Sequence, residues 1–468
     1  MMERGGIVTR ALLFVLVWLS VAWFGSWELN PNNAVRMFAA VSLVEDGDAT
    51  IDQFAPLTID MATFGAHAYL DKAPGMTLMA LPAVAAVNAS SGWRSADVGM
   101  APGAPDMAHF LRARQWAAVA TGPAVLTALA AVLLYDIGLG LTGRAGAALF
   151  GALGYALGSP IWGWSGTLLG HATVAAMYVV AAWCFLRPPR WSTALLGGAA
   201  LGWAVVVEYQ AALAGSAIAI WAVLRWWRTV EGRRAIVVAA IGGVAALLPL
   251  GAYNIVAFGT PFRVGYSGVV GFEGMNQGLF GLTWPRPMVL LEILLGDRRG
   301  LFWFAPVLLM APLGLAALAD ERRTRGLAIM AAAAAAIVLL VNASYFYWDG
   351  GNSTGPRHAM PAVALLAIGL APWWASLRST AARLGGAVLL GGSIALNAVI
   401  AAADVFAPPE VRYPFWRYVV ERRFWPGDLT TFPSEWLGWT RWAGFWSWAA
   451  VATVLLALLV ARVRRGSA

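Results

Sequence analysis

Ionisable residues that could perform chemistry gather between residues 28 and 75. This segment holds seven carboxylates and, with them, Arg36, His67 and Lys72. Carboxylates exchange protons, and Lys and Arg bind anions, so these residue types suit proton transfer beside a negatively charged group. Placing such groups next to apolar sequence costs free energy unless they pair or serve a function. The segment therefore predicts a functional site, with a solvated loop whose charges face water as the alternative.

A second cluster lies between two apolar runs, at residues 347–359. It contains three glycines that permit close approach of the backbone, and Arg357 stands where the next apolar run begins. Arg357 could contact an anion, while Asp349 and Asn352 could contact polar groups beside it. A tight glycine-rich turn that carries an interfacial arginine is the alternative interpretation.

A third group, at residues 258–300, carries Arg263, Arg298 and Arg299. Long loops tolerate basic residues on either side of a membrane, so their presence needs no function. The functional alternative is a groove for an anionic lipid head group.

Two isolated residues, His171 and Glu208, lie near the ends of apolar runs. Ionisable groups at such positions are functional candidates by default. Together with a carboxylate from residues 28–75 they could hold a divalent cation. For His171 a satisfied structural contact is an equally good interpretation.

The elements that must position these residues are apolar helices. Of the 468 residues, 60% are hydrophobic and 12% are charged, whereas soluble proteins average about 25% charged residues. A hydrocarbon core needs roughly 20 apolar helical residues to be crossed. Twelve runs are of adequate length, near residues 8–27, 113–135, 145–162, 170–186, 192–208, 210–225, 235–257, 301–318, 326–346, 360–376, 384–404 and 444–462. We therefore expect an all-α polytopic membrane protein, a single domain with about 12 transmembrane helices.

Arginine placement predicts the orientation of these spans. With the N-terminus inside, every short inside loop is basic, and twelve spans return the C-terminus to the inside. The net charge of +8 therefore reflects topology, and no nucleic-acid partner is expected. The long outside loops are 28–112, 258–300, 347–359 and 405–443. Residues 75–88, apolar but short, predict a helix in the membrane interface.

The order of motifs in the first outside loop resembles the GT-C superfamily, polytopic glycosyltransferases that use polyprenyl-phosphate sugars. Arg36 follows the first span, Glu45-Asp46-Gly47-Asp48 comes next, and Tyr69 precedes Asp71-Lys72-Ala73-Pro74-Gly75 at the start of an apolar helix. The sequence is most similar to the branch of lipid A aminoarabinose transferases and protein O-mannosyltransferases. The resemblance implies a bacterial inner-membrane protein with both termini in the cytoplasm and a periplasmic active site.

The resemblance also implies a reaction, in which one sugar moves from a polyprenyl-phosphate donor to a glycan, lipid or protein of the cell envelope. A phosphate leaves easily, so one carboxylate acting as base on the acceptor hydroxyl could suffice. In the family an Asp-Glu pair follows the first span, but Asn32 and Asn33 stand there in this chain. An amide cannot accept a proton as a carboxylate does. Asp60 and Asp71, with Asp46 third, are the replacement candidates.

The donor phosphate would need cationic clamps. Lys72 and Arg357 are the first candidates, followed by Arg298, Arg299 and Arg263. The other candidate donor-binding residues are Asp349, Asn352, Tyr69 and His67, with His171 and Glu208 as a separate site.

Two other functions stay open. A transporter or lipid-linked-sugar flippase should carry charges along span interiors and break its helices at mid-membrane, whereas the mid-span regions here are almost free of charge. A catalytically inactive GT-C scaffold would explain Asn32. No cofactor is certain, and a divalent cation is the one that the residues would permit.

Overall fold

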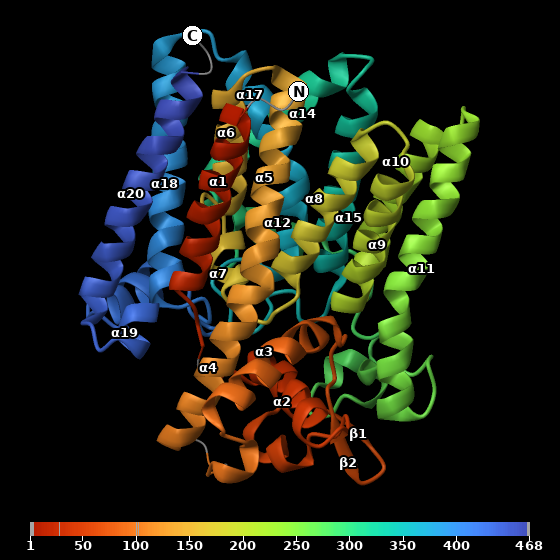
Figure 1. Ribbon diagram of the computed structural model, residues 1–468, viewed down its shortest axis with the longest axis vertical. Helices are drawn as coiled ribbons and strands as arrows, with labels where there is room; N and C mark the ends of the chain where they lie inside the picture. Colours follow the sequence, from red (N-terminus) through yellow and green to blue (C-terminus); the bar gives the residue numbers. More distant parts are fainter. Residues whose placement is uncertain (1–3, 28, 100, 102, 466–468) are drawn as a thin grey trace.

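The computed structural model describes residues 4–27, 29–99, 101 and 103–465; Glu28, at the start of the first outside loop, lies outside them. The chain forms a bundle of long helices that run side by side, with a smaller layer of short elements at one end (Figure 1). The first helix, α1 (Arg4–Trp23), begins at the opposite end of the bundle, where the last helix, α20 (Arg441–Arg465), ends. This arrangement agrees with the expected separation of the termini from the first outside loop.

Each apolar run of the sequence forms one helix or a group of consecutive helices. Besides α1 and α20, the single helices are α8 (His171–Leu186), α9 (Trp191–Val207), α10 (Ala211–Trp226), α11 (Val230–Phe258), α15 (Arg325–Ser344) and α18 (Thr380–Ala403). The groups are α4 (Pro105–Thr121) with α5 (Pro123–Thr142), α6 (Ala145–Ala156) with α7 (Ile161–Ser165), α13 (Leu301–Phe304) with η5 (Pro306–Met310) and α14 (Ala311–Asp320), and α16 (Met360–Ala367) with α17 (Leu370–Ser376).

The all-α polytopic fold class is confirmed, but not the count of about 12 spans. By length and composition, six helical segments of the described residues could cross a membrane, or seven if the bent pair Arg357–Ala367 and Leu370–Ser376 forms one span. Six further apolar helices have 10–17 residues. Breaks at proline, such as Pro160 before α7 and Pro306 after α13, shorten several of the individual helices.

The layer at one end of the bundle, which we term the outer layer, is formed by the segment expected to be the first outside loop. It contains α2 (Pro31–Glu45), η1 (Asp52–Leu57), the antiparallel strands β1 (Ala62–Phe64) and β2 (His67–Tyr69), α3 (Gly75–Ser91) and η2 (Ser95–Asp97). Helix α2 begins where the side chain of Asn30 accepts a hydrogen bond from the Asn33 N–H at 3.3 Å. It ends before Gly47, whose φ of +73° favours glycine. The helix expected at residues 75–88 forms as part of α3.

Several shorter elements complete the fold. They are η3 (Gly265–Gly268), η4 (Glu273–Asn276), α12 (Pro287–Leu295), η6 (Arg357–Ala359), the π-helical η7 (Phe415–Phe424) and α19 (Phe432–Trp436).

Helices α9 and α11 pack through glycines. A Cβ at Gly198 would lie 1.8 Å from the carbonyl oxygen of Ala239, and one at Gly202 would lie 2.3 Å from that of Gly243. Glycines four residues apart let two helices approach closely. Such close packing promotes helix association in a membrane, where lipid covers apolar side chains as well as another helix does. The contact fixes α9, whose C-terminal end carries Glu208.

We expect Gly198→Ala to destabilise the protein, because the added methyl group requires α9 and α11 to separate. Overpacking of this kind costs about 1–3 kcal/mol. The control is Gly391→Ala on α18, where a Cβ would have no neighbour within 4 Å and where helix propensity favours alanine. Thermal unfolding in detergent should show a lower Tm for the first variant only. Equal Tm values for the two variants would contradict this packing.

Candidate functional site

A cavity of about 590 Å³ lies between the outer layer and the bundle. Its charged lining residues come from distant parts of the chain: Arg36, Asp60, Asp71, Lys72, Glu208 and Arg357. Of the residues predicted from the sequence, those that line it are Asp60, Asp71, Lys72, His171, Glu208, Asn352 and Arg357. The first outside loop and the 347–359 loop therefore contribute to one site, although about 275 residues of sequence separate Lys72 from the second of them.

Lys72 lies between two carboxylates in the loop that joins β2 to α3. Its Nζ donates to Oδ1 of Asp60 at 2.9 Å and also pairs with the carboxylate of Asp71. Asp71 is 1% exposed and Asp60 is 8% exposed, so the lysine charge is matched by carboxylates within the protein. The other oxygen of Asp71, Oδ1, has no hydrogen-bond partner among the described residues.

Burial and pairing together change the proton affinities of this group. Burial by itself would lower the pKa of Lys72, but the nearby carboxylates of Asp71 and Asp60 outweigh it, and the pKa lies above its usual value. Burial raises the pKa of Asp71, and Lys72 opposes that change. Lys72 is therefore a cation at neutral pH.

The position of Lys72 depends on Gly75, the first residue of α3. A Cβ at Gly75 would lie 2.7 Å from the carbonyl oxygen of Val206, near the end of α9. The missing side chain thus lets the start of α3 touch the end of α9. The same contact brings the loop of Lys72 toward Glu208, the residue that follows α9.

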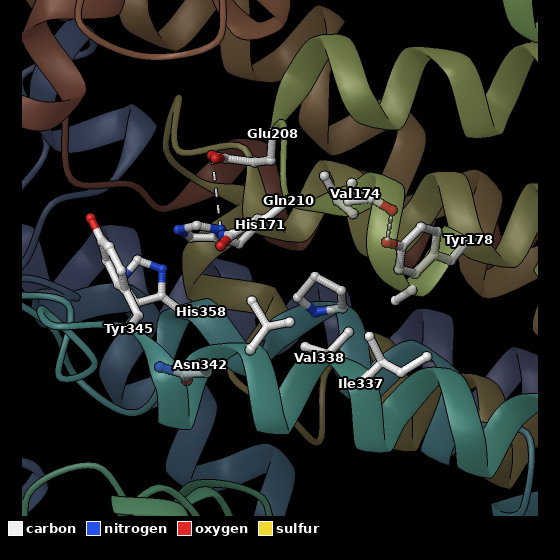
Figure 2. A pocket seen from close by; sticks show the side chains of 14 residues that line it. His171, Val174, Tyr178, Glu208, Gln210, Ile337, Val338, Asn342, Tyr345 and His358 are labelled. Atoms are coloured by element: carbon white, nitrogen blue, oxygen red, sulfur yellow. Dashed lines mark hydrogen bonds and ion pairs between the residues drawn. The ribbon is translucent and has the colours of Figure 1, made fainter. Parts of the chain in front are cut away.

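Arg36 reaches the cavity from α2 and is 2% exposed. Its Nη1 donates to the backbone and side-chain oxygens of Asn32, both at 2.6 Å, and its Nη2 lies 3.5 Å from Oε1 of Glu208. Nδ1 of His171 lies 3.8 Å from the same oxygen (Figure 2). These two separations are too long for strong hydrogen bonds, so Glu208 faces a cation and an imidazole while keeping an oxygen unbonded.

Within the described part of the chain, Arg357 is the cation of the cavity that has no carboxylate paired with it. Its Nε has no hydrogen-bond partner among the described residues, and no carboxylate there lies within ion-pair distance of it. Gly350 permits this placement, because a Cβ there would lie 2.8 Å from Nε of Arg357, and its φ of +76° favours glycine. The unpaired guanidinium is therefore the group best suited to an incoming anion.

Arg299, expected to contact a phosphate, instead binds the backbone. It is 0% exposed, and it donates to the carbonyl oxygens of Asp349 at 2.7 Å, Gly351 at 2.8 Å and Arg298 at 3.1 Å. It thus holds the glycine-rich loop that precedes Arg357. Oδ1 of Asp349 accepts from the N–H of Gly351 at 3.2 Å, which tightens the same turn.

The structure does not bring the other predicted residues into the cavity lining. Asp46 is exposed and accepts from Gln53, and His67 is exposed and pairs with Asp52. Tyr69 packs against Phe258, Arg263 lies 5.5 Å from the ring of Phe64, and Arg298 reaches the carbonyl of Pro409 at 3.4 Å. Alternation along β2 and the direction of each loop decide these orientations, and sequence spacing does not reveal them.

The divalent-cation site considered for His171 and Glu208 gains no support. Within the described residues, no group of three or more His, Cys, Asp or Glu side chains is arranged to hold a metal ion.

Sequence reasoning missed several residues of the site. Neither Arg36 nor His358 is among the catalytic or donor-binding residues predicted from the sequence, although both line the cavity. Aromatic side chains form another part of the lining, namely Tyr209, Tyr266, Phe272, Tyr345 and Tyr347. The signal for Arg36 was available, since it is the one charged residue between Pro31 and Val44 in α2. No comparable signal marks the aromatic residues in a chain with 25 tryptophans and 20 phenylalanines.

Comparison with known proteins finds similarity in structure only. No family model and no curated protein matches the sequence. The crystal structure of ArnT from Cupriavidus metallidurans bound to undecaprenyl phosphate matches with a TM-score of 0.51 and 16% identity, covering 98% of this chain and 73% of the ArnT chain. The apo structure of the same protein matches with a TM-score of 0.49 and 16% identity, covering 98% and 76%. The chain therefore has the fold of ArnT, a GT-C aminoarabinose transferase, and the GT-C fold expected from the sequence is confirmed.

We expect Arg299→Ala to destabilise the protein because it leaves backbone carbonyls unpartnered in a buried loop. Each such loss costs about 1–3 kcal/mol. The matched control is Arg298→Ala, since Arg298 makes one contact of 3.4 Å and a change of that kind is within ~0.5 kcal/mol. Thermal unfolding should lower the Tm for Arg299→Ala alone. A similar Tm for both variants would show that Arg299 does not hold the loop.

Proposed function

We propose that this protein is a membrane glycosyltransferase that moves a sugar from a polyprenyl-phosphate donor to a hydroxyl group of an envelope glycan, lipid or protein. The observation that carries the proposal is the meeting of the cations Lys72, Arg357 and Arg36 with the carboxylates Asp60 and Asp71 in one cavity. A donor phosphate needs the cations, and an acceptor hydroxyl needs a carboxylate base. The likeness of the fold to ArnT, which was solved with undecaprenyl phosphate bound, supports this class of donor.

In the proposed reaction, Asp60 accepts the proton of the acceptor hydroxyl while the hydroxyl oxygen attacks the anomeric carbon of the sugar. The bond between that carbon and the phosphate oxygen breaks, and its electron pair leaves with the polyprenyl phosphate, so the configuration at the anomeric carbon inverts. Asp60 is assigned this role because it is more exposed than Asp71, 8% against 1%. Asp71 then keeps Lys72 in position.

The phosphate would bind first to Arg357, whose charge no carboxylate contacts. Lys72, shared between two carboxylates, and Arg36, held by Asn32, would complete the clamp. The cavity is also lined by Leu213 of α10, which is 47% exposed on the bundle surface. An apolar rim residue on a lipid-facing helix suits access by a donor that carries a polyprenyl tail.

Removing the gene tests the function directly. We expect mass spectrometry of envelope glycans and glycolipids to show the loss of one sugar, restored by the wild-type gene and not by an Asp60→Asn copy. A flippase for lipid-linked sugars is the second candidate, because a cavity that binds the donor would serve transport as well. Movement of undecaprenyl-phosphate sugar across liposomes by the purified protein, with an unchanged envelope in the deletion strain, would favour the flippase.

The two carboxylates should differ when each is changed to asparagine. Asp60→Asn should lower transfer roughly 10²- to 10⁴-fold, the usual contribution of a general base, and Asp71→Asn should lower it less, because Asp71 is not the proposed base. Binding of undecaprenyl phosphate should change to the same extent in both variants, since Lys72 loses one of its two carboxylate partners in each. Transfer by the purified variants and binding by native mass spectrometry give the two measurements. Full activity in both variants would remove the base assignment.

Arg357→Ala should weaken binding of undecaprenyl phosphate and lower transfer by roughly 10²-fold or more, as expected when a preorganised donor to a developing anion is lost. Arg357→Lys should recover part of the binding, because lysine supplies the charge without the bidentate geometry. Arg417→Ala, an exposed arginine on η7 away from the cavity lining, is the control. Equal binding by Arg357→Ala and Arg417→Ala would contradict the phosphate clamp.

A further inference from the structure

A smaller cavity, which we term the side recess, adjoins the main cavity. Its volume is about 30 Å³, against about 590 Å³ for the main cavity. The two cavities share the lining residues His171, Glu208, Gln210, Tyr345 and His358. These residues therefore mark the place where the side recess meets the site proposed to bind the donor.

The two ends of the side recess differ in chemistry (Figure 2). Glu208, His171 and His358 lie toward one end, and Val338 and Ile337 lie toward the other. The remaining lining residues of the apolar part are Val174, Ala211, Ala214, Val341 and Pro361. The hydroxyl of Tyr178, which also lines the recess, donates to the carbonyl oxygen of Ala211 at 2.7 Å, so its hydrogen-bonding need is met there. The apolar end thus offers only carbon surface.

The polar end holds hydrogen-bonding groups whose capacity is not used. Oε1 of Glu208 and both ring nitrogens of His358 are buried and have no hydrogen-bond partner among the described residues. A neutral imidazole has one donating and one accepting nitrogen, and a carboxylate only accepts. Because buried polar groups are nearly always hydrogen-bonded in native proteins, this end is suited to a ligand that both donates and accepts.

The polar end is also next to the phosphate clamp. His358 follows Arg357 in the chain, and Oε1 of Glu208 lies 3.5 Å from Nη2 of Arg36. A sugar linked to a phosphate held by these arginines would therefore place the substituent of its C-2 atom, the neighbour of the anomeric carbon, within reach of the side recess.

We propose that the side recess binds an acetamido group on C-2 of the donor sugar, so that the sugar transferred is an N-acetylated amino sugar; this inference rests on the proposed glycosyltransferase function. The amide N–H donates to Glu208, the amide oxygen accepts from His358, and the methyl group occupies the apolar end among Val338 and its neighbours. A water molecule needs ~10–15 Å³ of such space, so the recess accommodates a group of a few atoms.

Other occupants match the side recess less well. A hydroxyl group would use the polar end and leave the apolar end unfilled, and the methyl group of a deoxy sugar would do the reverse. A polyprenyl chain is far larger than 30 Å³ and would leave Glu208 and His358 without partners. A group that has polar atoms next to the sugar ring and an apolar tip matches both ends of the side recess.

The test compares three probes on the purified full-length protein in nanodiscs: undecaprenyl phosphate, undecaprenyl phosphate glucose and undecaprenyl phosphate N-acetylglucosamine. The two sugar-bearing probes differ only at C-2. We expect the N-acetylated probe to bind roughly 10- to 200-fold more tightly than the glucose probe, the range by which a filled apolar pocket discriminates between ligands. Competition measured by native mass spectrometry gives the ratio.

Val338→Phe fills the side recess from α15 and should abolish the preference, while undecaprenyl phosphate binds as to the wild type. Leu340→Phe is the matched control, since Leu340 is on the same helix, is 42% exposed and does not line the recess. Ala214→Val, a smaller change in the recess lining, replaces Val338→Phe if the latter has a lowered Tm. His358→Phe should also remove the preference for the N-acetylated probe.

Each other outcome overturns a distinct claim. Equal binding of the two sugar-bearing probes to the wild type would overturn the acetamido proposal and leave the glycosyltransferase proposal intact. Weaker binding of undecaprenyl phosphate itself to Val338→Phe or Ala214→Val would assign the side recess to the lipid chain and overturn the proposal. Failure of all three probes to bind would overturn the proposed function and this inference with it.

Discussion

The burial of Lys72 between Asp60 and Asp71 is the interaction on which the site depends. Removing an ion from water costs several kcal/mol unless partners inside the protein replace the lost hydration. Both carboxylates therefore have to be in place before the lysine can be buried, and the loop of residues 60–72, which includes the β1–β2 hairpin and carries all three, is fixed by this requirement. The N–H of Asp60 donates to the hydroxyl of Thr58 at 3.1 Å, which anchors the loop at one end. Gly75 anchors it at the other end by its contact with α9.

The same interaction determines which cation is free. Three cations and three carboxylates line the cavity. Their charges are equal in number, but among the described residues not every cation has a carboxylate next to it. Lys72 takes Asp60 and Asp71, and Glu208 faces Arg36. Arg357 is left without a carboxylate beside it, which gives the wall next to the 347–359 loop a positive charge. An anionic ligand therefore suits this part of the cavity better than a neutral solute does.

Much of the fold could be predicted from the sequence, because apolarity is a local property and each apolar run became a helix or a group of helices. Lys72 and Arg357 could be identified from the sequence because charged residues are scarce in this chain. The direction in which each side chain points could not be predicted in the same way, because it depends on the three-dimensional course of the chain. Arg299 has the residue type of a phosphate ligand, yet each of its three nitrogen atoms donates to a backbone carbonyl oxygen. His67 is close to Lys72 in sequence, but the β-hairpin directs it to Asp52.

Asn32 and Asn33 stand where the resemblance to GT-C glycosyltransferases led us to expect an acidic pair, and both have structural roles in this chain. Oδ1 of Asn33 accepts from the N–H of Leu168 at 2.7 Å, while its Nδ2 donates to Oε1 of Gln115 at 3.2 Å. An amide performs both tasks, but an ionised carboxylate has no proton to donate, so Asp at this position would oppose the Gln115 oxygen. Asn32 in turn accepts from Arg36. Both amides thus serve the structure, which supports the proposal that the proton acceptor is one of the carboxylates that hold Lys72.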